Sequence, residues 1–242
     1  MGKRGQVTLF VVMAIIIVGS AIGILYTQTG LFKGETVNPE IAPIKSFVDG
    51  CVAETGKGAL VIIGQQGGYY QPPALSLSRY PYYFYNNKSL VPSISKIESE
   101  LADYFNQNLP FCIENFANFS DFNIVADSQV ISKATILADK VRFDVVYKIT
   151  IKKGDSTYRL SSFSTEIPSR LITIYRVIQD FMAEQLKDPT SICVSCTMNL
   201  ALDNNLFIDD VYSQNNTLFI ITDNQTLINN YPYKFLFANH YG

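Results

Sequence analysis

The chain has 242 residues, of which 48% are hydrophobic and 17% charged, with a formal net charge of −2. Because phosphate binding needs clustered Lys and Arg, and this chain has no basic block, we expect no nucleic-acid partner. The sequence has no Gly-rich phosphate loop with Lys, no His-Glu-x-x-His pair and no Gly-x-Ser-x-Gly turn. These absences favour a protein that is not an enzyme and has no cofactor or metal ion.

A cationic head followed by a long apolar run is the most informative pattern. Lys3 and Arg4 precede the run Val7–Tyr26, which contains no charge. At a helical rise of ~1.5 Å per residue, such a run reaches ~30 Å, the thickness of the hydrocarbon core of a bilayer. The sequence therefore predicts a transmembrane helix in contact with membrane lipid. The positive-inside rule keeps the head in the cytoplasm and places everything after Tyr26 outside the cell.

Three processing outcomes are open for this segment: an uncleaved anchor, a secretory signal peptide cut after Gly23, and cleavage after Gly5. The third outcome is indicated by a resemblance. The head Lys3-Arg-Gly-Gln-Val-Thr-Leu9, followed by an apolar helix, resembles the class III signal of archaeal type IV pilins. That resemblance implies cleavage between Gly5 and Gln6, after which the apolar helix packs in the core of a filament. Many pilins carry Glu at the fifth mature position, where this chain has Phe10.

Two further segments extend the resemblance along the chain. The whole chain is similar to membrane-anchored surface proteins of small-genome archaea. The segments that carry this resemblance are the head, Gly64–Tyr70 and Phe235–Asn239. This resemblance implies a cell-surface location rather than an activity. Within the apolar helix, Gly19 and Gly23 have the small-xxx-small spacing that lets two helices approach closely, which favours self-association in the membrane.

The remainder of the chain divides into a stalk, residues 27–40, and an extracellular domain, residues 41–242. Apolar residues at helical spacing predict a first helix from about Ala42 to Gly64. The following segment is rich in tyrosine and proline, and we expect irregular extended chain with one short edge strand. Its rings form either a sugar- or partner-binding surface or part of the core. The tyrosines of this patch are Tyr69, Tyr70, Tyr80, Tyr82, Tyr83 and Tyr85.

A second helix is predicted from a capping box at Ser95 and Glu98 to about Gln107, with Pro110 ending it. The clearest strand signal is the alternation of Val141–Ile151, which predicts the middle strand of an antiparallel meander. Pro168 then opens a helix that stops before Pro189. Three more strands, at 205–212, 217–222 and 233–238, complete the chain. The predicted fold class is α+β, an antiparallel sheet with helices packed on one face.

Four cysteines and four glycosylation sequons fit the predicted exterior location. An even cysteine count outside the cytoplasm favours disulfides, and we favour Cys51–Cys112, with Cys193 and Cys196 either bridged or free. The Cys-x-x-Cys spacing also permits a redox or zinc site, although His240 is the only histidine of the chain. The sequons begin at Asn87, Asn118, Asn215 and Asn224, and a glycan is expected on at least one of them.

Together these patterns favour a non-enzymatic cell-surface structural protein, either a pilin-like filament subunit or a membrane-anchored extracellular domain. A monomeric anchored adhesin that binds a glycan or a surface protein is an alternative. An extracytoplasmic thiol-redox or zinc protein that uses Cys193 and Cys196 is another. Asp209 and Asp210 do not form a catalytic pair, because adjacent residues of a strand point to opposite faces.

Overall fold

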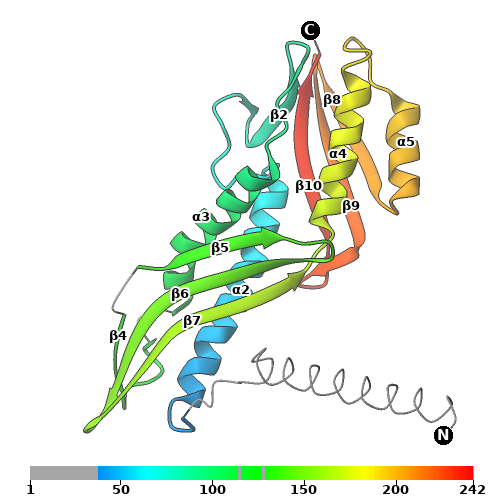
Figure 1. Ribbon diagram of the computed structural model, residues 1–242. Helices are drawn as coiled ribbons and strands as arrows, with labels where there is room; N and C mark the ends of the chain where they lie inside the picture. The colour runs from blue at the N-terminus through cyan, green and yellow to red at the C-terminus, as the bar shows by residue number, and fades with distance from the viewer. Residues whose placement is uncertain (1–37, 114–115, 127–128, 242) are drawn as a thin grey trace, which may run out of the picture. The chain divides into compact units, whose positions relative to one another are not determined.

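The predicted α+β class is confirmed by the computed structural model, which describes residues 38–113, 116–126 and 129–241. The chain divides into two units, Met1–Ala42 and Pro43–Gly242, and all the described strands belong to the second unit. Among the described residues are four helices, shown in Figure 1. They are α2 (Ala42–Gln65), α3 (Ile94–Ile113), α4 (Leu171–Gln185) and α5 (Val194–Asp203).

The strands form two separate sheets, whereas the sequence predicted one antiparallel sheet with helices on one face. The four-stranded sheet contains β4 (Asn123–Ala126), β5 (Ile131–Ile136), β6 (Lys140–Lys153) and β7 (Ser156–Pro168). The six-stranded sheet contains β1 (Ser76–Leu77), β2 (Tyr80–Tyr85), β3 (Lys88–Ser89), β8 (Phe207–Ser213), β9 (Asn216–Ile228) and β10 (Tyr231–His240).

The four-stranded sheet contains the predicted meander. Strand β6 pairs with β7 along one side and with β5 and β4 along the other, all antiparallel. The alternation of apolar and polar residues along β6 buries one face of the sheet against α2 and α3. Phe143 of β6 stacks on Phe105 of α3 at a ring-centroid distance of 5.1 Å.

The six-stranded sheet is mixed rather than antiparallel. Strand β2 lies parallel to β10, with Ala238 opposite Tyr82, and β10, β9 and β8 follow in antiparallel order. The prolines around β2 suggested irregular chain, but pairing with the last strand of the chain stabilises an extended segment there. This pairing joins residues more than 150 positions apart, which no local pattern encodes.

Helix α3 differs from its prediction at both ends. Its first turn is capped by Ser93, whose Oγ accepts a hydrogen bond from Lys96 N at 3.2 Å, so the predicted box at Ser95 and Glu98 does not form. Glu98 instead accepts a hydrogen bond from Ile136 N of β5 at 2.8 Å. The helix also continues past Pro110, which lies in its last turn, to Ile113.

Helix α5 was not predicted, although its apolar residues Val194, Met198 and Leu202 have helical spacing. No residue of α5 is buried, and these three side chains are exposed. Cys193 is its N-cap residue and its sulfur accepts a hydrogen bond from Cys196 N at 3.3 Å. None of the described helices is long and apolar enough to cross a membrane, and the predicted anchor 7–26 lies outside the described residues.

Candidate functional site

The two faces of the six-stranded sheet have very different surroundings. From Thr217 to Asp223, every odd-numbered residue of β9 is buried and every even-numbered residue is partly exposed. The buried face packs on α4, where Phe181 contacts Phe219 at a ring-centroid distance of 4.9 Å. The even-numbered residues therefore point away from α4.

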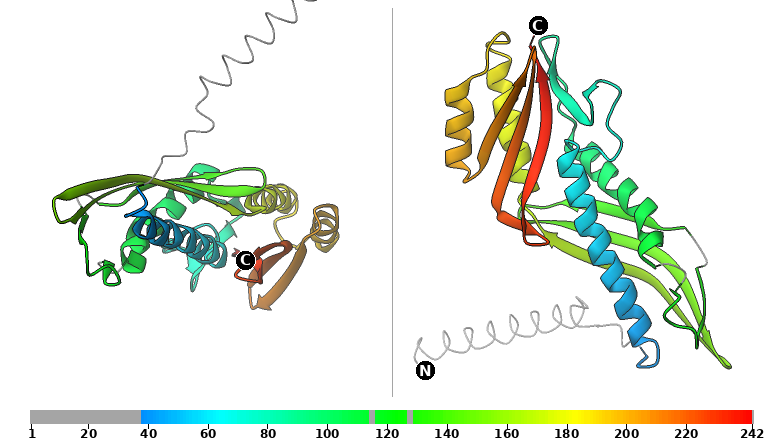
Figure 2. Two further views of the ribbon diagram at one scale, coloured as in Figure 1. Left: turned by 90° about the horizontal axis from the view of Figure 1, so that it is seen from below. Right: turned by 180° about the vertical axis from the view of Figure 1, so that it is seen from behind.

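We call the face that points away from α4 the open face. Residues directly opposite each other on paired strands share a face, so the register of β8, β9 and β10 gives its members. From these strands they are Phe207, Asp209, Val211, Ser213, Asn216, Leu218, Ile220, Thr222, Lys234, Leu236, Ala238 and His240. From β2, Tyr82 joins them opposite Ala238. In the right-hand view of Figure 2, these strands lie in front of α4, and no helix of the described residues 43–241 crosses β8 or β9 on this side.

Apolar side chains dominate the centre of the open face. Leu218, Ile220 and Leu236 are partly exposed there, and Val211 and Phe207 at the edge are 54% and 58% exposed. In the sequence, Leu218-Phe-Ile-Ile221 is apolar at both parities, the pattern of a strand that is covered on both faces. This apolar run was the only sequence signal for the open face. It did not enter the prediction, because the binding surface was predicted from the tyrosines alone.

An aromatic cluster lies at one end of the open face and contains two of the predicted tyrosines. The ring of Tyr85 stacks on His240 at a ring-centroid distance of 5.0 Å, and Tyr82 meets the same ring edge-on at 6.0 Å. The Tyr82 hydroxyl donates to Asn216 Oδ1 at 2.8 Å, and His240 Nδ1 lies 2.9 Å from the same oxygen. The tautomer of His240 with its proton on Nδ1 can donate to this carbonyl oxygen. Burial raises the pKa of Tyr82, and the neighbouring Tyr85 adds to the increase.

The other predicted tyrosines lie elsewhere. Tyr83 is fully buried, where it stacks on Phe237 at 4.7 Å and its hydroxyl donates to the carbonyl oxygen of Gly67 at 2.9 Å. It therefore belongs to the core and not to a binding surface. Tyr69 and Tyr70 lie beside α3, and Tyr80, at the start of β2, is partly exposed. The sequence patch is thus divided between the core and separate surfaces.

A pocket of about 620 Å³ adjoins the other end of the open face, beside the C-terminal half of α2. It is lined by Val61, Gln65, Thr222, Ile228, Asn229, Tyr231, Pro232, Tyr233 and Lys234. Thr222 and Lys234 belong to both the pocket and the open face. The open face therefore runs from an aromatic cluster, across an apolar centre, to a concave end.

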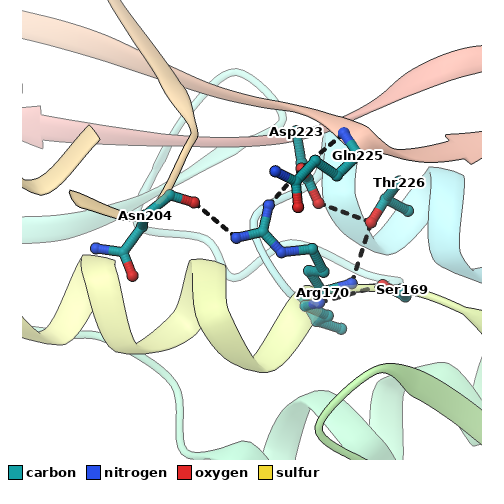
Figure 3. Close-up of polar contacts among 7 residues, drawn as sticks. Ser169, Arg170, Asn204, Asp223, Gln225 and Thr226 are labelled. Carbon is teal, nitrogen blue, oxygen red and sulfur yellow. Dashed lines mark hydrogen bonds and ion pairs between the residues drawn. The ribbon is translucent and has the colours of Figure 1, made fainter. Parts of the chain in front are cut away.

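A closed network of polar side chains lies on the buried face of the same sheet (Figure 3). Asp223 is 0% exposed, and its Oδ1 accepts hydrogen bonds from Arg170 Nη1 at 2.9 Å and from Gln225 N at 3.0 Å. Its Oδ2 accepts from Thr226 Oγ1 at 2.7 Å, and Arg170 Nη2 donates to the carbonyl oxygen of Asn204 at 2.6 Å. Because both carboxylate oxygens are satisfied within the protein, this network fixes the start of α4 and offers no free group for chemistry.

The cysteines form two disulfides, Cys51–Cys112 and Cys193–Cys196, and no cysteine of the described residues is free. The first is the pairing that the sequence favoured. The pocket that contains Cys196 is lined also by Asp180, Glu184 and Asp203, whose negative charges disfavour a reactive thiolate. Within the described residues, no group of three or more His, Cys, Asp or Glu side chains could hold a metal ion.

The four sequons lie in two kinds of site. Asn87 and Asn118 are exposed together with the serines of their triplets. Asn215 and Asn224 are exposed as well, but the threonines of these triplets, Thr217 and Thr226, are 1% and 4% exposed. The remaining predicted site residues, Gly5, Gln6, Gly19 and Gly23, lie outside the described residues.

Comparisons of this chain with protein-family models, with curated proteins and with solved structures found no match.

Proposed function

We propose that this chain is a non-enzymatic cell-surface protein whose N-terminal apolar helix holds it in the membrane or in a pilin-like filament. The observation that carries the proposal is the uncharged run Val7–Tyr26 directly after a cationic head. Two disulfides support it, because disulfides persist in oxidising compartments outside the cytoplasm. The domain then acts by presenting the open face to a partner.

Membrane fractionation of the full chain in a cell that exports it tests this proposal. We expect the chain to stay in the membrane pellet after an alkaline wash and to lose residues 41–242 to protease added outside the cells. A variant without residues 1–26 should leave the membrane fraction. A full chain that is recovered in the cytosol with reduced cysteines would contradict the proposal.

The mass of the mature chain separates the two forms of the proposal. A chain that begins at Gln6 and forms filaments visible by electron microscopy supports the pilin-like subunit, because cleavage after Gly5 keeps the apolar helix. A chain that begins at Met1 and is monomeric in detergent supports the anchored domain.

A binding module is a second candidate function, and the aromatic cluster of Tyr82, Tyr85 and His240 favours it. Flat rings give a large contact area with few rotatable bonds, and Asn216 beside them adds polar groups. Tyr85→Ala should abolish binding to a glycan array, whereas Tyr158→Ala on β7 should not. Equal binding by both variants would argue against the cluster as the binding site.

A further inference from the structure

The open face carries one negative and one positive charge on opposite sides of its apolar centre. On β8, β9 and β10, Asp209 and Lys234 are its only Asp, Glu, Lys or Arg residues. Both are exposed, and neither has an ion-pair partner among the described residues. Asp209 lies on β8 opposite Ile220 of β9, and Lys234 lies on β10 opposite Thr222 of β9. The two charges therefore lie on either side of β9. Along the strands they are offset by two residues, the separation of Ile220 and Thr222.

From this arrangement we infer that the open face binds the open face of a second copy of the chain. The twofold axis of this dimer runs parallel to β9, midway between the two open faces. Rotation about this axis places β8 of one copy over β10 of the other. Asp209 then meets Lys234 of the second copy, and the same pair recurs on the other side of the axis. The apolar centre of each face packs on that of the other, as two sheets do in a sandwich.

The sequence of β9 supports a covered face. Leu218 and Ile220 are as apolar as the buried Phe219 and Ile221, although a strand with one face in water normally alternates with polar residues. A second copy supplies the missing cover and removes these side chains from water. The inference does not depend on how the N-terminal segment is processed.

The charges also argue against another way to pair two copies, along the free edge of β8. Antiparallel pairing of two β8 strands about their central residue, Asp210, would place the Asp210 carboxylates of the two copies directly opposite each other. Like charges directly opposite each other destabilise a strand pair, whereas contact through the open face joins opposite charges. The open face is therefore the self-complementary surface.

The size of the open face indicates a weak contact. With strands ~4.8 Å apart and a rise of ~3.4 Å per residue, four strands as long as β8 cover roughly 450 Å². Stable complexes bury about 800 Å² per partner, so a transient dimer is expected in solution. Chains confined to one membrane have a high effective concentration, which favours such a contact.

Charge exchange tests the inference. The full chain is measured in detergent by sedimentation velocity over a wide concentration range. Every chain in the series, the reference included, carries Gly19→Leu and Gly23→Leu, which remove association through the apolar helix. Asp209→Lys and Lys234→Asp should each weaken the dimer about tenfold, because each change acts twice in a symmetric contact. The double variant D209K/K234D should restore it.

Asp210→Lys is the matched control, because it changes the same charge on the same strand but points to the opposite face. It should leave the dimer unchanged, and near-ultraviolet circular dichroism should show that all variants fold. A reference chain that stays monomeric at every concentration would overturn the inference. So would a dimer that neither single exchange weakens, or single exchanges that the double variant does not rescue.

Discussion

Asp223 illustrates how one buried charge is made tolerable in this domain. Its carboxylate lies on the buried face of β9, where an ion without partners would cost several kcal/mol of desolvation. The carboxylate accepts three hydrogen bonds, from Arg170, Gln225 and Thr226. Arg170 is held at the start of α4, and the other two residues are held on β9 itself. The neighbouring Tyr233 hydroxyl is buried and has no hydrogen-bond partner within the part of the chain that the structure describes.

Removal of the Asp223 charge should therefore destabilise the domain strongly. Asp223→Asn keeps the shape of the side chain but leaves the Arg170 guanidinium, whose side chain is 23% exposed, without its counter-ion. We expect a loss of about 3 kcal/mol in the free energy of unfolding in urea. Asp155→Asn in the exposed turn after β6 is the control and should change it by less than about 0.5 kcal/mol. Equal stabilities would mean that the ion pair contributes little.

Buried tyrosines should make the domain sensitive to alkaline pH. Burial raises the pKa of Tyr241 from 10.0 to about 12, and it raises the pKa values of Tyr83 and Tyr233 as well. Between pH 10 and 12 the folded state keeps protons that the unfolded chain has released, so stability is complete below pH 10 and falls as the pH rises towards 12. Urea unfolding at several alkaline pH values measures the decline. Tyr241→Phe should make it shallower, and an unchanged slope would contradict this assignment.

At the scale of elements, the contact of α2 with β10 depends on glycine. A Cβ built at Gly64 would collide with the carbonyl oxygen of Lys234 and with the Tyr233 ring, which lies across the same contact. The helix can approach the strand this closely only because Gly64 has no side chain. By contrast, a Cβ at Gly50, earlier in α2, would meet no atom within 4 Å.

These two glycines form a matched pair for mutation. Gly64→Ala should destabilise the domain by about 2 kcal/mol or more, because the Lys234 backbone must move to accommodate the methyl group. Gly50→Ala should stabilise it by about 0.5–1 kcal/mol, because alanine is the better helix former. Thermal unfolding followed by circular dichroism distinguishes the two, and the same sign of change for both would contradict the close contact between α2 and β10.

At the scale of the whole domain, the two disulfides constrain the chain over very different lengths. Cys51 of α2 and Cys112 of α3 are 61 residues apart in sequence, with their Cα atoms 5.6 Å apart, and their bond joins two helices beside the four-stranded sheet. Cys193 and Cys196 are three residues apart and constrain only the first turn of α5. A long closed loop removes more conformational freedom from the unfolded chain than a short one.

Loss of the long-range disulfide should therefore cost much more stability. By the loop-length relation, the double variant C51A/C112A should lose about 4 kcal/mol and the double variant C193A/C196A about 1.5 kcal/mol. Urea unfolding of both variants measures the difference. Equal losses would show that the stabilisation does not come from loop closure.

The sequence by itself determined the elements whose patterns are local. The apolar spacing of α2, the alternation of β6 and the stripe of α4 each follow from one buried face, so their bounds agree with the structure within a few residues. The capping box at Ser95 was wrong because Ser93 lies at a position where its side chain meets a free amide of the first turn. The missed helix α5 carries Val194, Met198 and Leu202 at helical spacing, but the structure leaves these side chains exposed, so this pattern does not mark a core face.

Only the tertiary structure decided which strands meet and which side chains share a surface. The parallel pairing of β2 with β10 made the six-stranded sheet mixed, because an extended segment is stabilised by whichever distant strand satisfies its backbone. The same pairing divided the tyrosine patch, burying Tyr83 and placing Tyr82 beside His240. The open face likewise exists only through the register of β8, β9 and β10, since each of its charges lies on a different strand.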